Sequence, residues 1–121
     1  MANTATTEHN PLHADYYADA ATQACVRIVE NIQLARDTYR IRFECPAIAR
    51  PIVPGQFLML RLAGCNDPLL GRPLALYDTV LNEAGRPSAI DVVYLTLGKM
   101  TRRLASYGPG DELEIWGPLG N

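Results

Sequence analysis

The sequence contains a single lysine, Lys99, because ten of its eleven basic residues are arginine. It has no run of basic residues, its net charge is −2 and its pI is about 5.6. This charge pattern excludes the basic patch of a nucleic-acid-binding protein. Arginine suits two-point recognition of an anion better than lysine does, although a GC-rich genome would produce the same bias.

Cysteine is also scarce. The three cysteines, Cys25, Cys45 and Cys65, are far apart and form no C-x-x-C motif, and His9 and His13 are distant from all of them in sequence. This spacing argues against a zinc or iron–sulfur site in these 121 residues, so we predict no metal ligands. We expect the thiols to be reduced and buried or half-buried.

Long hydrophobic stretches are missing as well. No window approaches the length of a membrane span, and the first twenty residues have neither the basic nor the apolar region of a secretory signal. We therefore expect a cytoplasmic protein without a membrane partner. Residues 1–22 contain no Lys or Arg and are expected to form a mobile leader; alternatively, "ADYYADAATQ" forms a short helix with Tyr16 and Tyr17 packed on the body.

Beyond this leader, the pattern of apolar residues predicts strands. In "TYRIRFE", Tyr39, Ile41 and Phe43 fall on one face and Arg40 and Arg42 on the other. The short segment "LARD" before it predicts a hairpin with the preceding strand. The predicted strands are "CVRIVENIQ", "TYRIRFE", "QFLMLRL", "RPLALY", "AIDVVYLTL" and "DELEIW".

Only "KMTRRLASY" is typical of a helix, which would begin after Gly98 and end at the Gly-Pro-Gly of residues 108–110. We expect "CPAIARPIVPG" to be a connection, because its three prolines cannot donate to a sheet, and "DTVLNEAGRPS" to be a long hairpin loop. These elements predict an all-β fold for residues 23–121: a six-stranded antiparallel Greek-key barrel with one short helix. Closure of the barrel would remove exposed strand edges.

The stretch "GRPLALYD" places Arg72 at the start of an apolar strand. Such an arginine is either a solvated turn residue or a ligand for an anion, since a guanidinium can grip a phosphate with two N–H donors. The start of the predicted helix offers further donors: main-chain N–H groups after Gly98 and the hydroxyl of Thr101. Two aromatic residues lie nearby: Tyr77 ends the predicted strand that begins with Arg72, and Tyr94 lies on the predicted strand that leads to Gly98. Such residues would suit a ligand with both rings and phosphates.

Four segments in this order resemble the flavin-binding barrel of the ferredoxin–NADP reductase superfamily: "PGQFLMLRL", "GRPLAL", "VVYLTLGKMT" and "PGDELEIWGPLGN". Within that superfamily they are similar to the electron-transfer subunit of class B dihydroorotate dehydrogenase. The resemblance covers the chain from about residue 24 to its end. It implies FAD as the cofactor, with Arg72 and the start of the helix on its pyrophosphate and no catalytic side chain in this domain. The implied cofactor-binding residues are Arg72, Pro73, Leu74, Ala75, Val93, Tyr94, Leu95, Met100 and Thr101.

The chain departs from the family pattern at two positions. Ala75 stands where the family usually has a hydroxyl residue that bonds flavin N5, a loss of about 1 kcal/mol. Met100 replaces a usual glycine, and its side chain is expected either to crowd the phosphate or to alter the approach of the backbone to it. Leu74 is aliphatic, as in the dihydroorotate subgroup, whereas most of the superfamily has an aromatic residue there.

The resemblance implies an NAD(P)H-linked electron-transfer flavoprotein of pyrimidine biosynthesis, in which hydride passes between nicotinamide and flavin and single electrons pass to an iron–sulfur centre. The sequence has no G-x-G-x-x-G motif and no cysteine cluster, so we expect the NAD-binding domain and the iron–sulfur centre only in a longer protein, together with a catalytic partner subunit. This 121-residue piece alone is not expected to be active. Two alternatives remain: a barrel without flavin that docks a partner subunit, and the flavin domain of an oxygenase-type reductase.

Overall fold

The structure, a computed structural model, describes residues 21–63 and 71–120. The predicted leader therefore lies outside the described residues except at its last two positions, and Cys65 lies outside them too. The alternative short helix "ADYYADAATQ" reaches the described residues only at 21–23, where Thr22 and Gln23 belong to a strand instead. In chain order the elements are β2 (Thr22–Ala35), β3 (Thr38–Glu44), α1 (Pro46–Ala49), β4 (Phe57–Leu62), β5 (Arg72–Ala75), β6 (Asp78–Leu81), β7 (Pro87–Leu95), α2 (Lys99–Leu104) and β8 (Glu112–Leu119).

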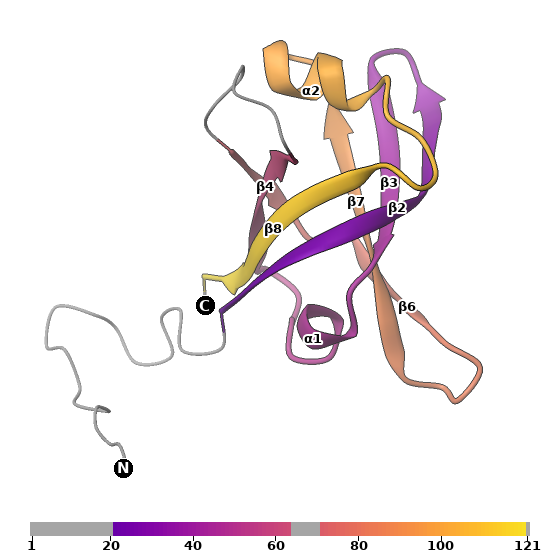
Figure 1. Cartoon of the computed structure of the whole chain (residues 1–121), viewed down its shortest axis with the longest axis vertical. Helices are drawn as coiled ribbons and strands as arrows, with labels where there is room; N and C mark the ends of the chain where they lie inside the picture. The colour runs from indigo at the N-terminus through magenta and orange to yellow at the C-terminus, as the bar shows by residue number, and fades with distance from the viewer. Residues whose placement is uncertain (1–20, 64–70, 121) are drawn as a thin grey trace, which may run out of the picture.

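The strands form one antiparallel sheet in the order β5-β4-β8-β2-β3-β7-β6. The last strand, β8, lies between β4 and β2, which is a Greek-key arrangement. Figure 1 shows the sheet curling around its core, with α1 near one end and α2 at the other. The predicted all-β antiparallel barrel is confirmed; the structure adds one strand and one short helix to the expected elements.

The hairpin of β2 and β3 follows the predicted alternation. Ala35 pairs with Thr38 across a two-residue turn, and Asp37 in that turn has φ 56°, a left-handed conformation that Asp tolerates. Ile41 and Phe43 are fully buried, whereas Arg40 and Arg42 lie on the outer face. The sequence thus identified which face of β3 packs on the core.

The core is built mostly from branched aliphatic side chains of the long strands, together with Phe43 and with residues of both helices. Truncating one of these side chains to alanine would cost about 2–5 kcal/mol. The largest fully buried side chains of the core are those of Phe43, Ile41, Ile48, Leu58, Leu60, Leu62, Ile90, Met100, Leu104, Leu113, Ile115 and Val92.

Two elements differ from the sequence prediction. The proline-rich connection contains α1, because Pro46 occupies the first turn of a helix, where its missing N–H group costs nothing. The carbonyl of Cys45 accepts the N–H groups of Ile48 and Ala49 at this turn. The expected long hairpin loop contains β6, which pairs with the first half of β7. A strand of four residues is too short to give a recognisable alternation of apolar and polar residues.

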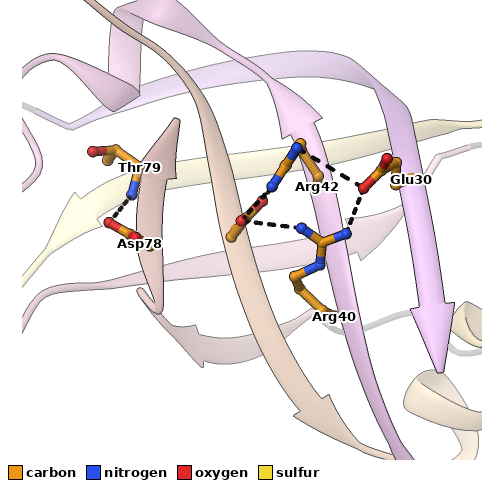
Figure 2. Close-up of polar contacts among 6 residues, drawn as sticks. Glu30, Arg40, Arg42, Asp78 and Thr79 are labelled. Carbon is orange, nitrogen blue, oxygen red and sulfur yellow. Dashed lines mark hydrogen bonds and ion pairs between the residues drawn. The ribbon is translucent and has the colours of Figure 1, made fainter. Parts of the chain in front are cut away.

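The outer face of β2, β3 and β7 carries a network of four charges. Arg42 binds both oxygens of Asp91 through Nε (2.7 Å) and Nη2 (2.9 Å). Arg40 donates to Asp91 Oδ2 at 3.4 Å and pairs with Glu30 (Figure 2). Asp91 is only 5% exposed, and its hydrogen bond raises the pKa of Arg42. Removing one member of such a desolvated network leaves its partners uncompensated.

The chain crosses from one half of the sheet to the other between β5 and β6. The N–H of Leu76 donates to the carbonyl of Gln56, next to β4, and the N–H of Tyr77 donates to the carbonyl of Asp91 in β7. The two ends of the sheet are therefore joined through two consecutive residues. This connection closes one end of the barrel and leaves β5 and β7 to diverge toward α2.

The described thiols differ in exposure, since Cys25 is exposed and Cys45 is buried. Burial is the largest cause that raises the pKa of Cys45. In residues 21–63 and 71–120, no group of three or more His, Cys, Asp or Glu side chains is arranged to hold a metal ion. The same residues include no helix with the length and apolar character to span a membrane.

Candidate functional site

A cleft of about 490 Å³ lies where β5, β7 and the start of α2 face one another. It opens because β6 pairs with β7 only as far as Asp91. The rest of that edge of β7 faces β5, whose own strand partner is β4. The cleft is lined by Arg72, Pro73, Leu74, Ala75, Val93, Tyr94, Leu95, Leu97, Gly98 and Thr101.

The free edge of β7 supplies main-chain groups to the cleft. The carbonyl of Asp91 points to this edge, because it accepts the N–H of Tyr77. Alternate residues of a strand direct their N–H and C=O groups to the same edge, so the main chain of Val93 and Leu95 also faces the cleft. The carbonyl of Leu95 accepts the N–H of Leu97 at 2.9 Å, which turns the chain toward α2.

Arg72 is the first residue of β5 and is exposed. Its register places it opposite Leu60, on the inward-facing side of the strand at the open end of the barrel. A Cβ built on Gly98 would lie 3.7 Å from Arg72 Nη2, so the guanidinium lies directly beside the N-cap of α2. Among the described residues Arg72 has no ion-pair partner.

The turn into α2 is fixed by Thr101. Its hydroxyl oxygen accepts the N–H groups of Leu97 and Gly98, both at 3.1 Å, and its hydrogen is directed to the carbonyl of Gly98 at 3.2 Å. The sequence suggested Thr101 as a hydroxyl donor to an anion. In the structure the hydroxyl shapes the turn that brings Gly98 against Arg72.

Eight of the nine predicted site residues line the cleft, and Met100 is the exception. Its side chain is 1% exposed and belongs to the hydrophobic core. The expectation that this side chain would crowd a phosphate is wrong, because the second helical position points inward when Gly98 caps the helix. Leu74 also packs against the core, whereas Ala75 is exposed to the cleft.

Tyr94 contributes to the site mainly through its position on β7. Its ring is 3% exposed and stacks on Tyr39, with ring centroids 5.7 Å apart and planes 19° from parallel. Its hydroxyl donates to Asn31 Oδ1 at 2.9 Å. Burial raises the pKa of Tyr94 to about 12, so this hydroxyl remains protonated at neutral pH.

The sequence missed two lining residues, Leu97 and Gly98, as members of the site. Gly98 was identified only as the residue before the helix. Leu97 is 75% exposed, and a single exposed leucine in a connection gives no sequence signal. Leu97 and Leu95 extend the apolar wall of the cleft beyond the end of β7.

A second depression, of about 210 Å³, lies on the outer face of β4 and β8 around Trp116 and Met59. Its charged side chains, Arg61 and Glu114, pair with each other. The cleft at Arg72 differs, because Arg72 has no ion-pair partner within residues 21–63 and 71–120 and most of the other lining residues are apolar. That combination suits an elongated ligand with an anionic part and a flat apolar part.

Comparison with known proteins agrees with this chemistry. Residues 25–121 match the family described as the oxidoreductase FAD-binding domain. The electron transfer subunit of dihydroorotate dehydrogenase B (NAD(+)) from Desulforamulus reducens is 36% identical over 95 residues, which cover 78% of this chain and 34% of that protein. The same subunit from Fusobacterium nucleatum is 28% identical over 93 residues, which cover 77% of this chain and 34% of that protein.

Solved structures share the fold. The NADH-dependent reduced ferredoxin–NADP oxidoreductase superposes with a TM-score of 0.68 at 28% identity, covering 81% of this chain and 33% of that one. The cytochrome b5 reductase domain of Ulva prolifera nitrate reductase superposes with a TM-score of 0.62 at 20% identity, and the match covers 82% of this chain and 40% of that one. At 20% identity, the similarity to the cytochrome b5 reductase domain shows a shared fold and nothing more.

A Greek-key barrel that opens into an arginine-bearing cleft beside a short helix defines the flavin-binding barrel of the ferredoxin–NADP reductase class. The chain belongs to the oxidoreductase FAD-binding domain family, and its cofactor is FAD. The Arg72 guanidinium, the exposed main chain of β7 and the apolar walls fit the diphosphate and ring systems of that cofactor. The chain spans about a third of the length of the curated relatives it matches.

Proposed function

We propose that FAD binds in the cleft between β5, β7 and α2, with its diphosphate between the Arg72 guanidinium and the main chain at the start of α2. Arg72 supplies two N–H donors in a fixed plane, a geometry that matches phosphate oxygens. Gly98 leaves room beside that guanidinium because it has no side chain. The cofactor-binding residues are then Arg72, Pro73, Leu74, Ala75, Val93, Tyr94, Leu95, Met100 through its N–H group, and Thr101.

The apolar part of the cleft would hold the ring systems. Pro73 and Ala75 form one wall on β5, and Val93, Leu95 and Leu97 form the other. These side chains exclude water from one side of a bound ring, and the main chain of β7 offers hydrogen bonds along the open edge. The protein's part is to hold and orient the cofactor, and bound FAD supplies the exchange between two-electron and one-electron transfer.

We further propose that this domain belongs to an NAD(P)H-linked electron-transfer flavoprotein that serves pyrimidine synthesis in the cytoplasm. The relatives named above are electron transfer subunits of dihydroorotate dehydrogenase B, and each is about three times as long as the matched region. The additional length would supply the nicotinamide-binding domain and the iron–sulfur ligands. A catalytic subunit would be the partner that exchanges electrons with it.

The observation that carries the binding proposal is the approach of Arg72 to Gly98 across the open end of the barrel. The test is a titration of the 121-residue protein with FAD, followed by flavin fluorescence and isothermal calorimetry. We expect one site with weak affinity, because much of the flavin would be surrounded by the rest of a longer protein. A tight stoichiometric yellow complex would contradict that expectation of weakness, and no binding at millimolar protein would contradict the cleft as an FAD site.

The main alternative is a barrel that docks a partner subunit without flavin. Ala75 is the remaining feature that favours it, because Met100 packs in the core and leaves the cleft free. The same titration on a longer protein distinguishes the two functions. Quenching and a shift of the flavin spectrum support the flavoprotein, whereas an unchanged spectrum together with partner binding supports the docking module.

A further inference from the structure

We propose that Asn31 is a positioning residue for the cofactor cleft: its side-chain amide ties the C-terminal end of α2 to Tyr94 of β7 and so fixes the two sides of the cleft relative to each other. This inference rests on the proposed function of the cleft. Asn31 itself lies on β2 and does not line the cleft.

The amide of Asn31 makes three hydrogen bonds to two elements. Its Nδ2 donates to the carbonyl of Leu104, the last residue of α2, at 2.9 Å and to the carbonyl of Tyr107, in the segment that follows the helix, at 3.0 Å. Its Oδ1 accepts the hydroxyl of Tyr94 at 2.9 Å. Both amide hydrogens and the oxygen are therefore used.

The chemistry of these partners fixes the orientation of the amide. The carbonyls of Leu104 and Tyr107 can only accept, so they must face the NH₂ group. A protonated Tyr94 hydroxyl then donates to the oxygen. A side chain without the NH₂ group loses the hydrogen bonds to the carbonyls of Leu104 and Tyr107. A side chain without the amide oxygen loses the hydrogen bond from Tyr94.

A β-bulge in β2 directs this amide inward. Ile28 faces the core, and strict alternation would place Glu30 on the same face and Asn31 outside. The register shifts between Ile28 and Glu30, which pairs Glu30 with Arg42 on the outer face and Asn31 with the buried Ile41. Bulges often re-aim a side chain near a functional site, and here the bulge places a polar amide between α2 and β7.

The short helix α2 depends on such contacts. With six residues it has little stability of its own, and its inward apolar residues, Met100 and Leu104, pack without strong directionality. The hydrogen bonds of Asn31 are directional, and they hold the helix end opposite Gly98. A shift of α2 along its axis would move Gly98 relative to Arg72, which is where the proposed diphosphate binds.

Two substitutions test separately the hydrogen bonds from Asn31 to the end of α2 and the hydrogen bond between Asn31 and Tyr94. Asn31→Asp keeps the oxygen that accepts from Tyr94 but places a carboxylate oxygen against the carbonyls of Leu104 and Tyr107, so it releases α2. Tyr94→Phe keeps the stacking on Tyr39 and releases β7. The control is Ile48→Ala, which removes a fully buried side chain from α1 near the far end of the barrel (Figure 1).

The measurement is the FAD dissociation constant of each variant and of the double variant, at a temperature where far-UV circular dichroism shows all of them folded. We expect at least tenfold weaker binding for Asn31→Asp, about threefold for Tyr94→Phe, and less than twofold for the control. The double variant should bind no more weakly than Asn31→Asp, because the two changes break one link. The visible circular dichroism of FAD at saturation should change in Asn31→Asp and not in Ile48→Ala.

The outcomes are distinguishable. If the unsubstituted protein does not bind FAD, the proposed function fails. If it binds FAD, and the Asn31 and Tyr94 variants match the control in affinity and spectrum, only the positioning role fails and Asn31 serves stability alone. Should Asn31→Asp not fold, Tyr94→Phe and Asn31→Ser against the same control decide the question by the same criteria.

Discussion

The guanidinium of Arg72 lies against the main chain of Gly98, close enough that a Cβ on Gly98 would be 3.7 Å from Nη2. The two residues come from different elements, the first position of β5 and the N-cap of α2. Their meeting point combines a delocalised cation with the start of a helix, two groups that favour negative charge.

Replacing Arg72 tests the anion site directly. Arg72→Lys should weaken FAD binding about tenfold and Arg72→Ala more, because a hydrogen bond to a charged group contributes about 1.5–3 kcal/mol and lysine lacks the planar fork. The urea midpoint should not change, since Arg72 is exposed and unpaired among the described residues. Arg61→Lys, at an ion pair on the outer face, is the control. Equal affinities for the Arg72 and Arg61 variants would place the anion elsewhere.

Gly98→Val tests whether the space beside Arg72 is needed by the ligand. Gly98 has φ −147° and ψ −177°, an extended conformation that any residue adopts, so the fold should persist. The added methyl groups would enter the cleft and weaken FAD binding about tenfold, in line with roughly 1–3 kcal/mol for overfilling a packed space. Gly108→Val, where a Cβ meets open space, should bind like the parent. Unimpaired binding by Gly98→Val would show that the ligand does not approach this turn.

Asp91→Asn should destabilise the fold by about 3 kcal/mol, because Arg42 and Arg40 would keep their charges in a largely desolvated position. The comparison is Glu114→Gln, which breaks the more exposed pair with Arg61 and should cost less than about 1 kcal/mol. Urea unfolding followed by circular dichroism measures both. A similar small loss of stability for the two variants would mean that the charge network on β2, β3 and β7 is effectively solvated.

The stability of the protein should fall at alkaline pH partly through Tyr94. Burial raises its pKa from 10.0 to about 12 in the folded state. The neutral hydroxyl is therefore favoured by folding, and this contribution is complete below pH 10 and lost as the pH rises from about 10 through 12. Its size is on the order of 2 kcal/mol. Unfolding free energies at several pH values should show a shallower alkaline decline in Tyr94→Phe than in the parent, and parallel curves would contradict the assignment.

The sequence predicted the parts of the fold in which the alternation of apolar and polar residues along a strand matches their burial in the structure. Ile41 and Phe43 alternate with arginines, and they are fully buried. The pattern was insufficient where a single residue changes the register. Strict alternation would put Asn31 outside, and only the bulge after Ile28 turns it inward. A bulge depends on pairing with another strand, so the sequence of β2 alone does not reveal it.

The site was predictable to the extent that it depends on residue type. Arg72 before a proline, and Gly98 before the helix that contains Thr101, indicated an anion site, and the structure brings these residues to one cleft. The inward direction of Met100 was not predictable from the family pattern, because it depends on how α2 lies over the core. Leu97 lines the cleft only because the chain turns back at Leu95.

The divergence of β5 and β7 leaves two strand edges facing each other across an open gap. Unpaired edges of this kind invite strand addition by another polypeptide. A ligand that spans the gap therefore does more than occupy a binding site, because it shields both edges at once. We therefore expect the apoprotein to self-associate through these backbone edges more readily than the protein saturated with cofactor.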